Sequence, residues 1–301
     1  MNGTERDTGV LIVDSEYSTT RRVVDVTPAE DAVYPSGIRS LLLPGRGDRV
    51  GEGGLRTRGY YKRSGIDKPL ITVITVVRNA EEKIEKAILS VLEQSYDNVE
   101  YIVIDGCSTD ATVEIIKQYE KAIDYWVSEG DNGVYDAMNK GVRVATGDYV
   151  LFLGSDDVLF DVFHEIADLL VEKTLSYYGS VILSKDKKVY DGRFNAFKLF
   201  LKNIPHQAIL YSRLMFDEHS FDTKYIAVAD YALNLKLFSD ERYGFRYIPF
   251  LIAIYDNENG LSSTVVDKVF SADKPTIIKK HYSNLYNKIY LLIRFVFRRK
   301  R

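Results

Sequence analysis

The stretch LITVITVV at residues 70–77 decides the fold of the central part of the chain. A continuous run of apolar and β-branched residues of this length is typical of a strand buried on both faces of a parallel sheet. Apolar residues at helical spacing follow within residues 81–94, and VEYIVID at residues 99–105 indicates a second strand. The sequence therefore predicts a β-α-β unit that begins near Lys68.

The same alternation of strands and helices continues beyond this unit. Further elements are expected at residues 111–119, 123–127, 136–145 and 149–153. The last of these strands ends at GSDD, residues 154–157. Because ligands of open α/β sheets bind outside the carboxyl ends of the strands, we expect Asp105 and Asp156 to face one crevice.

Composition and charge exclude several classes of protein. The chain has 301 residues, and 40 basic against 43 acidic residues give a net charge of -3, so no overall field attracts nucleic acid. A lone Cys107 excludes an internal disulfide and a cysteine zinc site, and we expect it to be a small buried residue. Without a secretory pattern or an apolar run of about 18 residues, we expect a cytoplasmic protein.

Five segments, in matching order and spacing, resemble family 2 glycosyltransferases. They are TVITVVRN (72–79), SVLEQSY (90–96), YIVIDGCSTDAT (101–112), DNGVYDAMNKG (131–141) and ATGDYVLFLGSDD (145–157). The resemblance covers residues 68–265 and is closest to the branch that assembles bacterial exopolysaccharide, O-antigen and colanic-acid-type repeat units on a lipid carrier. It implies an α/β GT-A fold, with a mostly parallel nucleotide-binding sheet flanked by helices.

The resemblance also implies an activity. A sugar would pass from a nucleoside-diphosphate sugar, which we expect to be a UDP-sugar, to a hydroxyl of a lipid-linked saccharide, with inversion and with Mn²⁺ or Mg²⁺. The chain reads RNAEEK after its first strand rather than a glycine-rich turn, which argues against a dehydrogenase and against a nucleotidyltransferase. An inactive sugar-nucleotide-binding scaffold remains an alternative.

The donor-binding residues are carried over from the family motifs. They are Thr75, Arg78, Asn79, Asp105, Asp136, Asn139, Lys140 and Asp157. The carboxylate of Asp105 is expected to accept a hydrogen bond from a uracil-type ring N–H, and its alternative role is to cap a turn. Asp136, Asn139 and Lys140 would face the ribose or the diphosphate, although ordinary surface polarity explains them equally well.

Metal binding and catalysis are expected at two acids. The D-x-D motif of the family is Gly154-Ser155-Asp156 here, so the first acid is missing and Asp156 is the expected metal ligand. Inverting transfer needs a base for the acceptor hydroxyl, and Asp230, ahead of an apolar helix, is the candidate, with a helix N-cap as its alternative role. His206 and Gln207 are expected near the acceptor and the pyrophosphate, although a lone histidine is often structural.

The chain is expected to divide into three parts. Residues 1–66 are expected to form an N-terminal arm. Eight of the 20 glycines lie between Gly37 and Gly65, and no regular helix or strand is expected in that stretch, whereas residues 10–13 and 23–26 could be short strands. Residues 67–265 form the GT-A domain, with a nucleotide-binding half (67–160) and an acceptor half (161–265). Residues 266–301 form a basic amphipathic tail, expected to lie on the anionic inner face of the cell membrane, unless it is simply a packed terminal helix.

Overall fold

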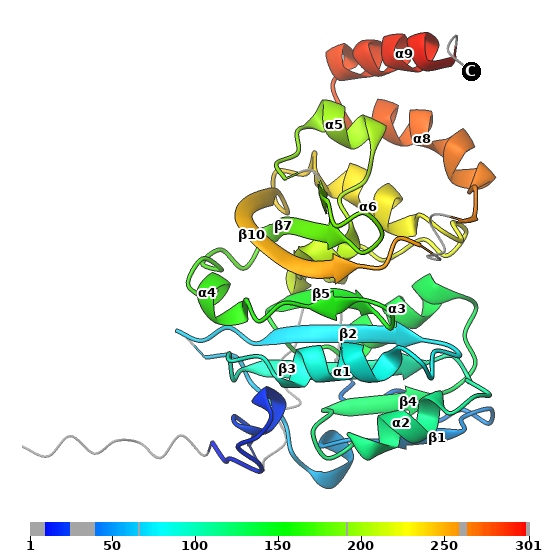
Figure 1. The fold of residues 1–301 in the computed structure, drawn as a ribbon. Coiled ribbons are helices and arrows are strands. Elements are labelled where there is room, and N and C mark those ends of the chain that lie inside the picture. The colour runs from blue at the N-terminus through cyan, green and yellow to red at the C-terminus, as the bar shows by residue number, and fades with distance from the viewer. Residues whose placement is uncertain (1–9, 25–39, 66, 191, 259–263, 299–301) are drawn as a thin grey trace, which may run out of the picture.

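The computed structural model describes residues 10–24, 40–65, 67–190, 192–258 and 264–298 (Figure 1). A ten-stranded sheet runs through it in the order β1-β4-β3-β2-β5-β9-β7-β10-β6, and β8 pairs with β7. The strands are β1 Gly51–Gly53, β2 Ile71–Val77, β3 Val99–Asp105, β4 Tyr125–Ser128, β5 Tyr149–Gly154, β6 Val158–Leu159, β7 Ser176–Leu183, β8 Val189–Tyr190, β9 Ile209–Ser212 and β10 Phe245–Tyr255.

Helices connect and cover these strands. The α-helices are α1 Ile84–Leu92, α2 Thr112–Gln118, α3 Val134–Val144, α4 Phe163–Ala167, α5 Ala196–Leu201, α6 Ala229–Leu237, α8 Lys268–His281 and α9 Asn284–Arg298. Short 3-10 helices are η1 Ser18–Thr20, η2 Arg56–Arg58, η3 His206–Ala208 and η4 Arg213–Asp217. Helices α5, α8 and α9 gather at the end of the molecule opposite α2 and β1 (Figure 1).

The predicted parallel sheet is confirmed in the first half of the domain. Strands β4, β3, β2 and β5 are neighbours and run parallel, and every residue of β2 and β3 is buried. Helix α3 packs closely on β2, and Gly141 permits this approach, since a Cβ atom added there would lie 2.5 Å from the side chain of Ile74. The carboxyl ends of β2, β3 and β5 therefore meet at one edge of the sheet, as predicted.

The second half of the domain extends the sheet in a different way. Strand β9 pairs antiparallel with both β5 and β7, whereas the long strand β10 runs parallel to β7 and antiparallel to β6. The complete sheet is therefore mixed, with its parallel core in the first half. Strand β10 curves around this half and ends beside the GSDD turn, where its last residues approach the candidate site (Figure 1).

The prediction that the glycine-rich stretch 37–65 lacks a regular strand is wrong. Strand β1 pairs antiparallel with β4 and extends the sheet at its edge. Arg56, 3% exposed, forms a buried ion pair with Glu100 of β3 and donates a 2.6 Å hydrogen bond to the carbonyl of Val144. Lys62 and Asp124 form a second buried ion pair at 3.2 Å. Residues 40–65 are thus built into the body of the domain.

The predicted helix of the tail is present as α9. Tyr286 and Tyr290 of α9 pack against the rings of Phe197 and Phe200 on α5, with ring centroids between 5.1 and 6.3 Å apart. The opposite side of α9 leaves several leucines exposed, among them Leu285. Within the described ranges, the chain has no helix with both the length and the apolar character needed to cross a bilayer.

Candidate active site

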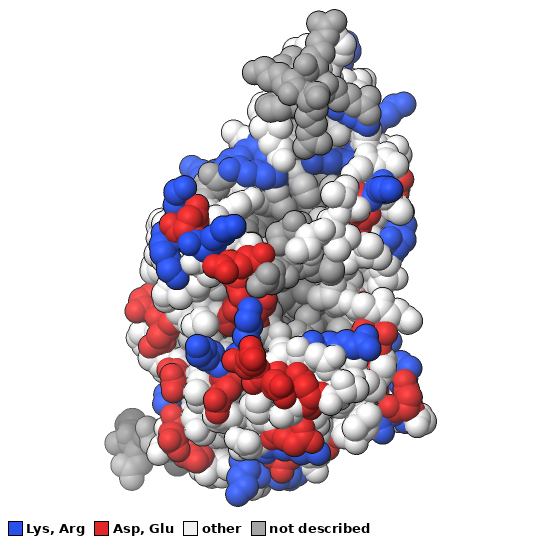
Figure 2. All heavy atoms as spheres, turned by 45° about the vertical axis from the view of Figure 1, so that its right-hand side comes forward, with Lys and Arg blue, Asp and Glu red and all other residues white. Residues whose placement is uncertain are grey.

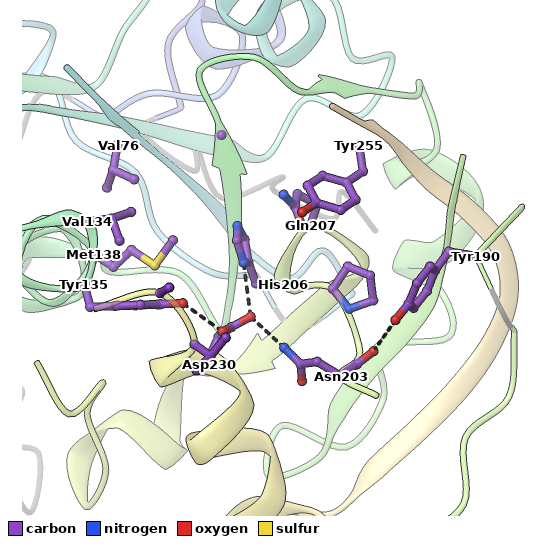
Figure 3. A pocket seen from close by; sticks show the side chains of 14 residues that line it. Val76, Val134, Tyr135, Met138, Tyr190, Asn203, His206, Gln207, Asp230 and Tyr255 are labelled. Carbon is purple, nitrogen blue, oxygen red and sulfur yellow. Dashed lines mark hydrogen bonds and ion pairs between the residues drawn. The ribbon is translucent and has the colours of Figure 1, made fainter. Parts of the chain in front are cut away.

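Asp230 is the centre of a cluster of polar side chains. It lies in the first turn of α6 and is 6% exposed. One carboxylate oxygen accepts a 2.8 Å hydrogen bond from the hydroxyl of Tyr135, and the other accepts one of 2.8 Å from the amide of Asn203 and lies 3.3 Å from Nδ1 of His206 (Figure 3). A carboxylate has about four lone-pair sites, so these three contacts leave one for an incoming hydroxyl.

The charges of this cluster affect its titration. Burial by itself lowers the pKa of His206, but the hydrogen bond to Asp230 and the negative charges of Asp230, Asp157 and Asp156 outweigh it, so the pKa is raised above its ordinary value. Burial and the charge of Asp230 raise the pKa of Tyr135 far above that of a free tyrosine. Tyr135 therefore keeps its proton and donates to Asp230.

A mainly apolar pocket, called the Asp230 pocket below, surrounds this cluster (Figure 3). Fourteen residues line it: Val76, Val134, Tyr135, Met138, Gly154, Tyr190, Asn203, Pro205, His206, Gln207, Ala227, Val228, Asp230 and Tyr255. They come from both halves of the domain. The structure thus brings three predicted residues, His206, Gln207 and Asp230, into a single pocket.

A second, more polar pocket, called the Arg78 pocket below, opens on the other side of the GSDD turn. Its lining residues are Arg78, Asn79, Ala80, Glu81, Glu82, Lys83, Asp110, Ser155 and Asp156. Gly154 lines the Asp230 pocket, while the next two residues line the Arg78 pocket. Three predicted donor or metal residues, Arg78, Asn79 and Asp156, therefore line one pocket. The GSDD turn separates this pocket from the candidate base, Asp230.

Within the turn, the neighbouring acids Asp156 and Asp157 have different surroundings. Asp157 is 1% exposed and accepts hydrogen bonds from the backbone N–H groups of Gly154 and Asp256, at 3.0 and 2.8 Å, and from the amide of Gln207 at 2.7 Å. Burial, with a contribution from the charge of Asp156, raises the pKa of Asp157 to about 6. Asp157 and Gln207 thus hold the turn against β10 and η3, and the geometry does not support direct donor contact by Asp157.

The missing first acid of the D-x-D motif has a steric reason. A Cβ atom added at Gly154 would lie 2.6 Å from a carboxylate oxygen of Asp157 and 2.8 Å from one of Asp156. Both distances are shorter than a carbon and an oxygen tolerate, so a larger residue at position 154 would force both acids to move. The turn is therefore built around glycine, and Asp156 is the one acid of the motif that lines the Arg78 pocket.

Two predicted base-binding residues are buried in the sheet. Thr75 is fully buried on β2, where its hydroxyl lies 3.0 Å from that of Tyr101. Asp105 is also fully buried, and its carboxylate accepts hydrogen bonds from the backbone and hydroxyl of Ser108 and from the hydroxyl of Ser128. Asp105 therefore does not face a crevice shared with Asp156 in the described part of the chain, because its buried carboxylate holds the start of the loop after β3.

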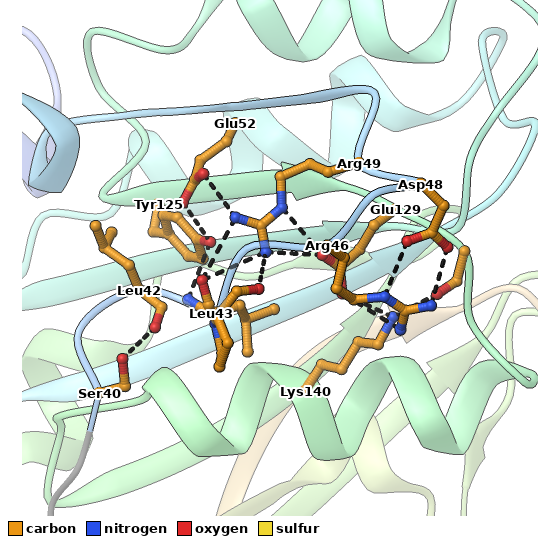
Figure 4. A network of polar contacts seen from close by, with 12 residues as sticks. Ser40, Leu42, Leu43, Arg46, Asp48, Arg49, Glu52, Tyr125, Glu129 and Lys140 are labelled. Carbon is orange, nitrogen blue, oxygen red and sulfur yellow. Dashed lines mark hydrogen bonds and ion pairs between the residues drawn. The ribbon is translucent and has the colours of Figure 1, made fainter.

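The three residues predicted on the exposed side of α3 are a further correction. Lys140 is 2% exposed and lies 3.0 Å from Glu129, which also binds Arg49 at 2.8 Å (Figure 4). Asn139 both donates to and accepts from the backbone of Phe221. Asp136 accepts a 3.0 Å hydrogen bond from the backbone N–H of Asn132, which lies just before α3. These side chains line neither of the two pockets, because internal contacts hold them in place.

Two smaller expectations concern loops. Cys107 is only partly buried and has a φ of 57°, so the prediction of a buried residue is wrong. Asn79 also has a positive φ, 52°, and bridges to the loop after β3 by accepting a 2.8 Å hydrogen bond from the backbone of Thr109.

Several side chains of the site were not singled out from the sequence. Tyr135 lies inside the motif DNGVYDAMNKG, and Asn203 stands three residues before His206, so proximity in sequence to predicted residues was the available signal. Lys83 and Asp256 are separated by 173 residues, yet their side chains lie 2.6 Å apart. No local pattern indicates such a pair.

The residues fit a divalent cation at Asp156 only with ligands from outside the protein. Within the described ranges, no group of three or more His, Cys, Asp or Glu side chains is arranged to hold a metal. The carboxylate of Asp156 forms no salt bridge with any described residue, and burial raises its pKa. A bound Mn²⁺ or Mg²⁺ would therefore combine Asp156 with diphosphate oxygens and water.

A mixed α/β sheet with a parallel core and two pockets beside one acidic turn is an architecture of enzymes that bind their ligands outside the carboxyl ends of the strands. Residues 72–232 match Glycosyl transferase family 2, and the chain belongs to this family. The protein is accordingly a glycosyltransferase with the GT-A fold, as predicted.

Individual relatives cover different shares of the chain. A PGL/p-HBAD biosynthesis glycosyltransferase of Mycobacterium tuberculosis is 35% identical over 213 residues, which are 67% of this chain and 82% of the relative. The putative teichuronic acid biosynthesis glycosyltransferase TuaG of Bacillus subtilis is 38% identical over 125 residues, covering 40% and 50%. Among solved structures, S. aureus TarS 1-349 in complex with UDP-GlcNAc has a TM-score of 0.60 at 17% identity and covers 74% of this chain and 70% of that one.

Proposed function

We propose that this glycosyltransferase moves a sugar from a nucleoside-diphosphate sugar, with UDP as the expected nucleotide, to a hydroxyl of a lipid-linked saccharide, with inversion at the anomeric carbon. The observation that carries the proposal is the arrangement of two pockets on either side of the GSDD turn. The Asp230 pocket holds a buried carboxylate with one free lone-pair site. The Arg78 pocket holds Asp156 together with two cationic side chains, Arg78 and Lys83, and three further acids, Glu81, Glu82 and Asp110.

The chemistry assigned to each residue follows from these positions. The acceptor hydroxyl would enter the Asp230 pocket and give its proton to Asp230 while it attacks the anomeric carbon. Tyr135 and Asn203 keep the carboxylate oriented by donating to it. A divalent cation on Asp156 would neutralise the charge that develops on the departing diphosphate. The geometry of Asp230 argues against the alternative of an inactive scaffold, because a protein that only binds needs no base there.

The donor is tested by nucleotide release from a panel of UDP-, GDP- and dTDP-sugars, with and without Mn²⁺. We expect metal-dependent release from one donor, and a loss on the order of 100-fold in Asp156→Ala, because a metal supplies several kcal/mol of charge stabilisation. Glu165→Ala, an exposed acid on α4, is the matched control. Binding of a nucleotide sugar without any release, even with acceptor lipids present, would favour the inactive scaffold.

The proposal of a membrane-bound acceptor draws on the surface and on the relatives. Two relatives are named for PGL/p-HBAD and teichuronic acid biosynthesis. Helix α9 is the outermost element at its end of the molecule, and it exposes Leu285 (66%), Leu292 (63%) and Phe295 (54%). Lys and Arg side chains cross the upper part of the face in Figure 2, whereas Asp and Glu gather lower down. We propose that this end lies on the anionic inner face of the cell membrane.

Cosedimentation with vesicles checks this surface. We expect Leu285→Glu/Leu292→Glu to weaken binding to phosphatidylglycerol vesicles at least tenfold, because burial of each leucine contributes about 1.5–3 kcal/mol. The double variant Val171→Glu/Val189→Glu places the same charges on two other exposed apolar residues and should bind as the wild type does. Equal binding by all three proteins would contradict membrane contact through α9.

A further inference from the structure

Lys83 and Asp256 join the two halves of the domain at the edge of the Arg78 pocket. Lys83 immediately precedes α1, and Asp256 immediately follows β10. The ammonium group lies 2.6 Å from the Asp256 carboxylate, and the Lys83 side chain is 43% exposed while that of Asp256 is 16% exposed. Lys83 lines the pocket together with Asp156. The cation is therefore accessible from the pocket, although it is paired.

The pocket needs positive charge for a diphosphate. With glycine at position 154, the turn offers one carboxylate for a metal, and Arg78 and Lys83 are the cationic side chains among the lining residues. The negative charges of Asp256 and Asp156 both act on Lys83, and the hydrogen bond to Asp256 raises its pKa. Lys83 is therefore a cation at neutral pH and lies beside the acid that would meet the diphosphate.

Asp256 does not depend on Lys83 for its position. Its carboxylate also accepts hydrogen bonds from the backbone N–H of Glu258 at 3.1 Å and from the hydroxyl of Ser184 at 3.3 Å. Its own N–H donates to the buried Asp157. The ion pair is partly exposed, so exchanging its carboxylate for another anion costs little. Lys83 can leave while Asp256 stays.

We propose that Lys83 is a ligand of the donor diphosphate. Asp256 pairs with Lys83 while the pocket is empty and competes with the diphosphate for Lys83 when the donor binds. This inference rests on the proposed function, because it names a residue that would bind the donor. It implies that Asp256 opposes donor binding, whereas a purely structural ion pair implies that both partners support it. The two partners of a single salt bridge are thus expected to have opposite effects.

Calorimetric titration with UDP, GDP and dTDP tests this, with and without Mn²⁺. For the diphosphate that the wild type binds, we expect Lys83→Met to lower the affinity about tenfold, since it removes a hydrogen bond between charged groups, and Lys83→Arg to restore part of it. Asp256→Asn should raise the affinity, because it releases Lys83. The corresponding nucleoside, which carries no phosphate, should bind all four proteins equally. Thermal unfolding checks that the variants are folded.

The outcomes separate this inference from the proposed function. Equal losses of diphosphate affinity in Lys83→Met and Asp256→Asn would overturn the role of Lys83 and leave the transferase proposal intact. A loss that extends to the nucleoside would also overturn it, because the phosphate contact would then not be the cause. If the folded wild type bound none of the three diphosphates, both proposals would be overturned.

Discussion

Asp230→Asn is expected to lower kcat for sugar transfer by about 10²–10⁴-fold, which is the usual contribution of a positioned base. The amide fills the same space but cannot take the proton of the acceptor hydroxyl. Asp230 does not line the Arg78 pocket, which lies on the other side of the GSDD turn and contains Arg78 and Asp156. The affinity for nucleoside diphosphate should therefore stay close to that of the wild type. Initial rates of nucleotide release with acceptor lipids, together with calorimetric titration, measure both quantities.

A control separates this loss from a general effect of removing charge. Asp222 lies in the same half of the domain, but its side chain is 37% exposed and pairs with Lys224 at 3.3 Å. Asp222→Asn should therefore transfer sugar at the wild-type rate. Since Asp230 carries three polar contacts, the thermal unfolding of Asp230→Asn should be recorded as well. A folded Asp230→Asn variant that kept more than a tenth of the wild-type kcat would rule out Asp230 as the base.

The nucleotide-binding half was predictable because its signals are local. The continuous β-branched run of β2 and the helical spacing that follows it depend on residues within one element. The expected helix at residues 81–94 is observed as α1, Ile84–Leu92, and the strand at residues 99–105 is observed as β3 with the same bounds. The hydrophobic pattern within one such segment is enough to predict its helix or strand, and the segments that pack against it do not need to be known.

The direction of each polar side chain was much less predictable. Asp230, His206 and Gln207 meet in one pocket, although Gln207 donates to Asp157. Thr75 and Lys140 belong to equally distinct motifs, yet both point into the protein. Whether a residue at a strand end or on a helix faces a pocket or the core depends on the elements packed against it. A motif identifies the region of the site but not the side chains that contact a ligand.

The order of the N-terminal extension was not predicted, because it depends on contacts that are not local in sequence. Its glycine-rich sequence indicates loops, and the contacts that order it are made with distant residues. Arg56 pairs with Glu100, which lies 44 residues later, and β1 pairs with the edge strand β4. Burial of Arg56 and Glu100 together leaves both charged and paired. An extension tied in this way is expected to contribute to the stability of the whole domain.

Arg56→Met is therefore expected to lower the free energy of unfolding by about 3–5 kcal/mol, as measured by urea denaturation. The cost arises because Glu100 would remain buried and charged without its partner. Burial alone raises the pKa of Glu100, but the charge of Arg56 and hydrogen bonds from Thr146 and Thr72 outweigh it, so the pKa is lowered in the native protein. The loss should extend to strand β3 and thus to the folding of the entire domain.

Two comparisons identify the buried charge as the cause. Arg56→Met/Glu100→Gln should recover part of the loss, since it removes the unpaired charge. Lys188→Met breaks an exposed pair with Asp186 and should unfold as the wild type does. In Arg56→Met the pKa of Glu100 rises, so protonation relieves the charge as the pH falls. The difference in stability from the wild type should then shrink at acidic pH. A difference independent of pH, with no recovery in the double variant, would mean that packing of the arginine stem, not its charge, anchors the extension.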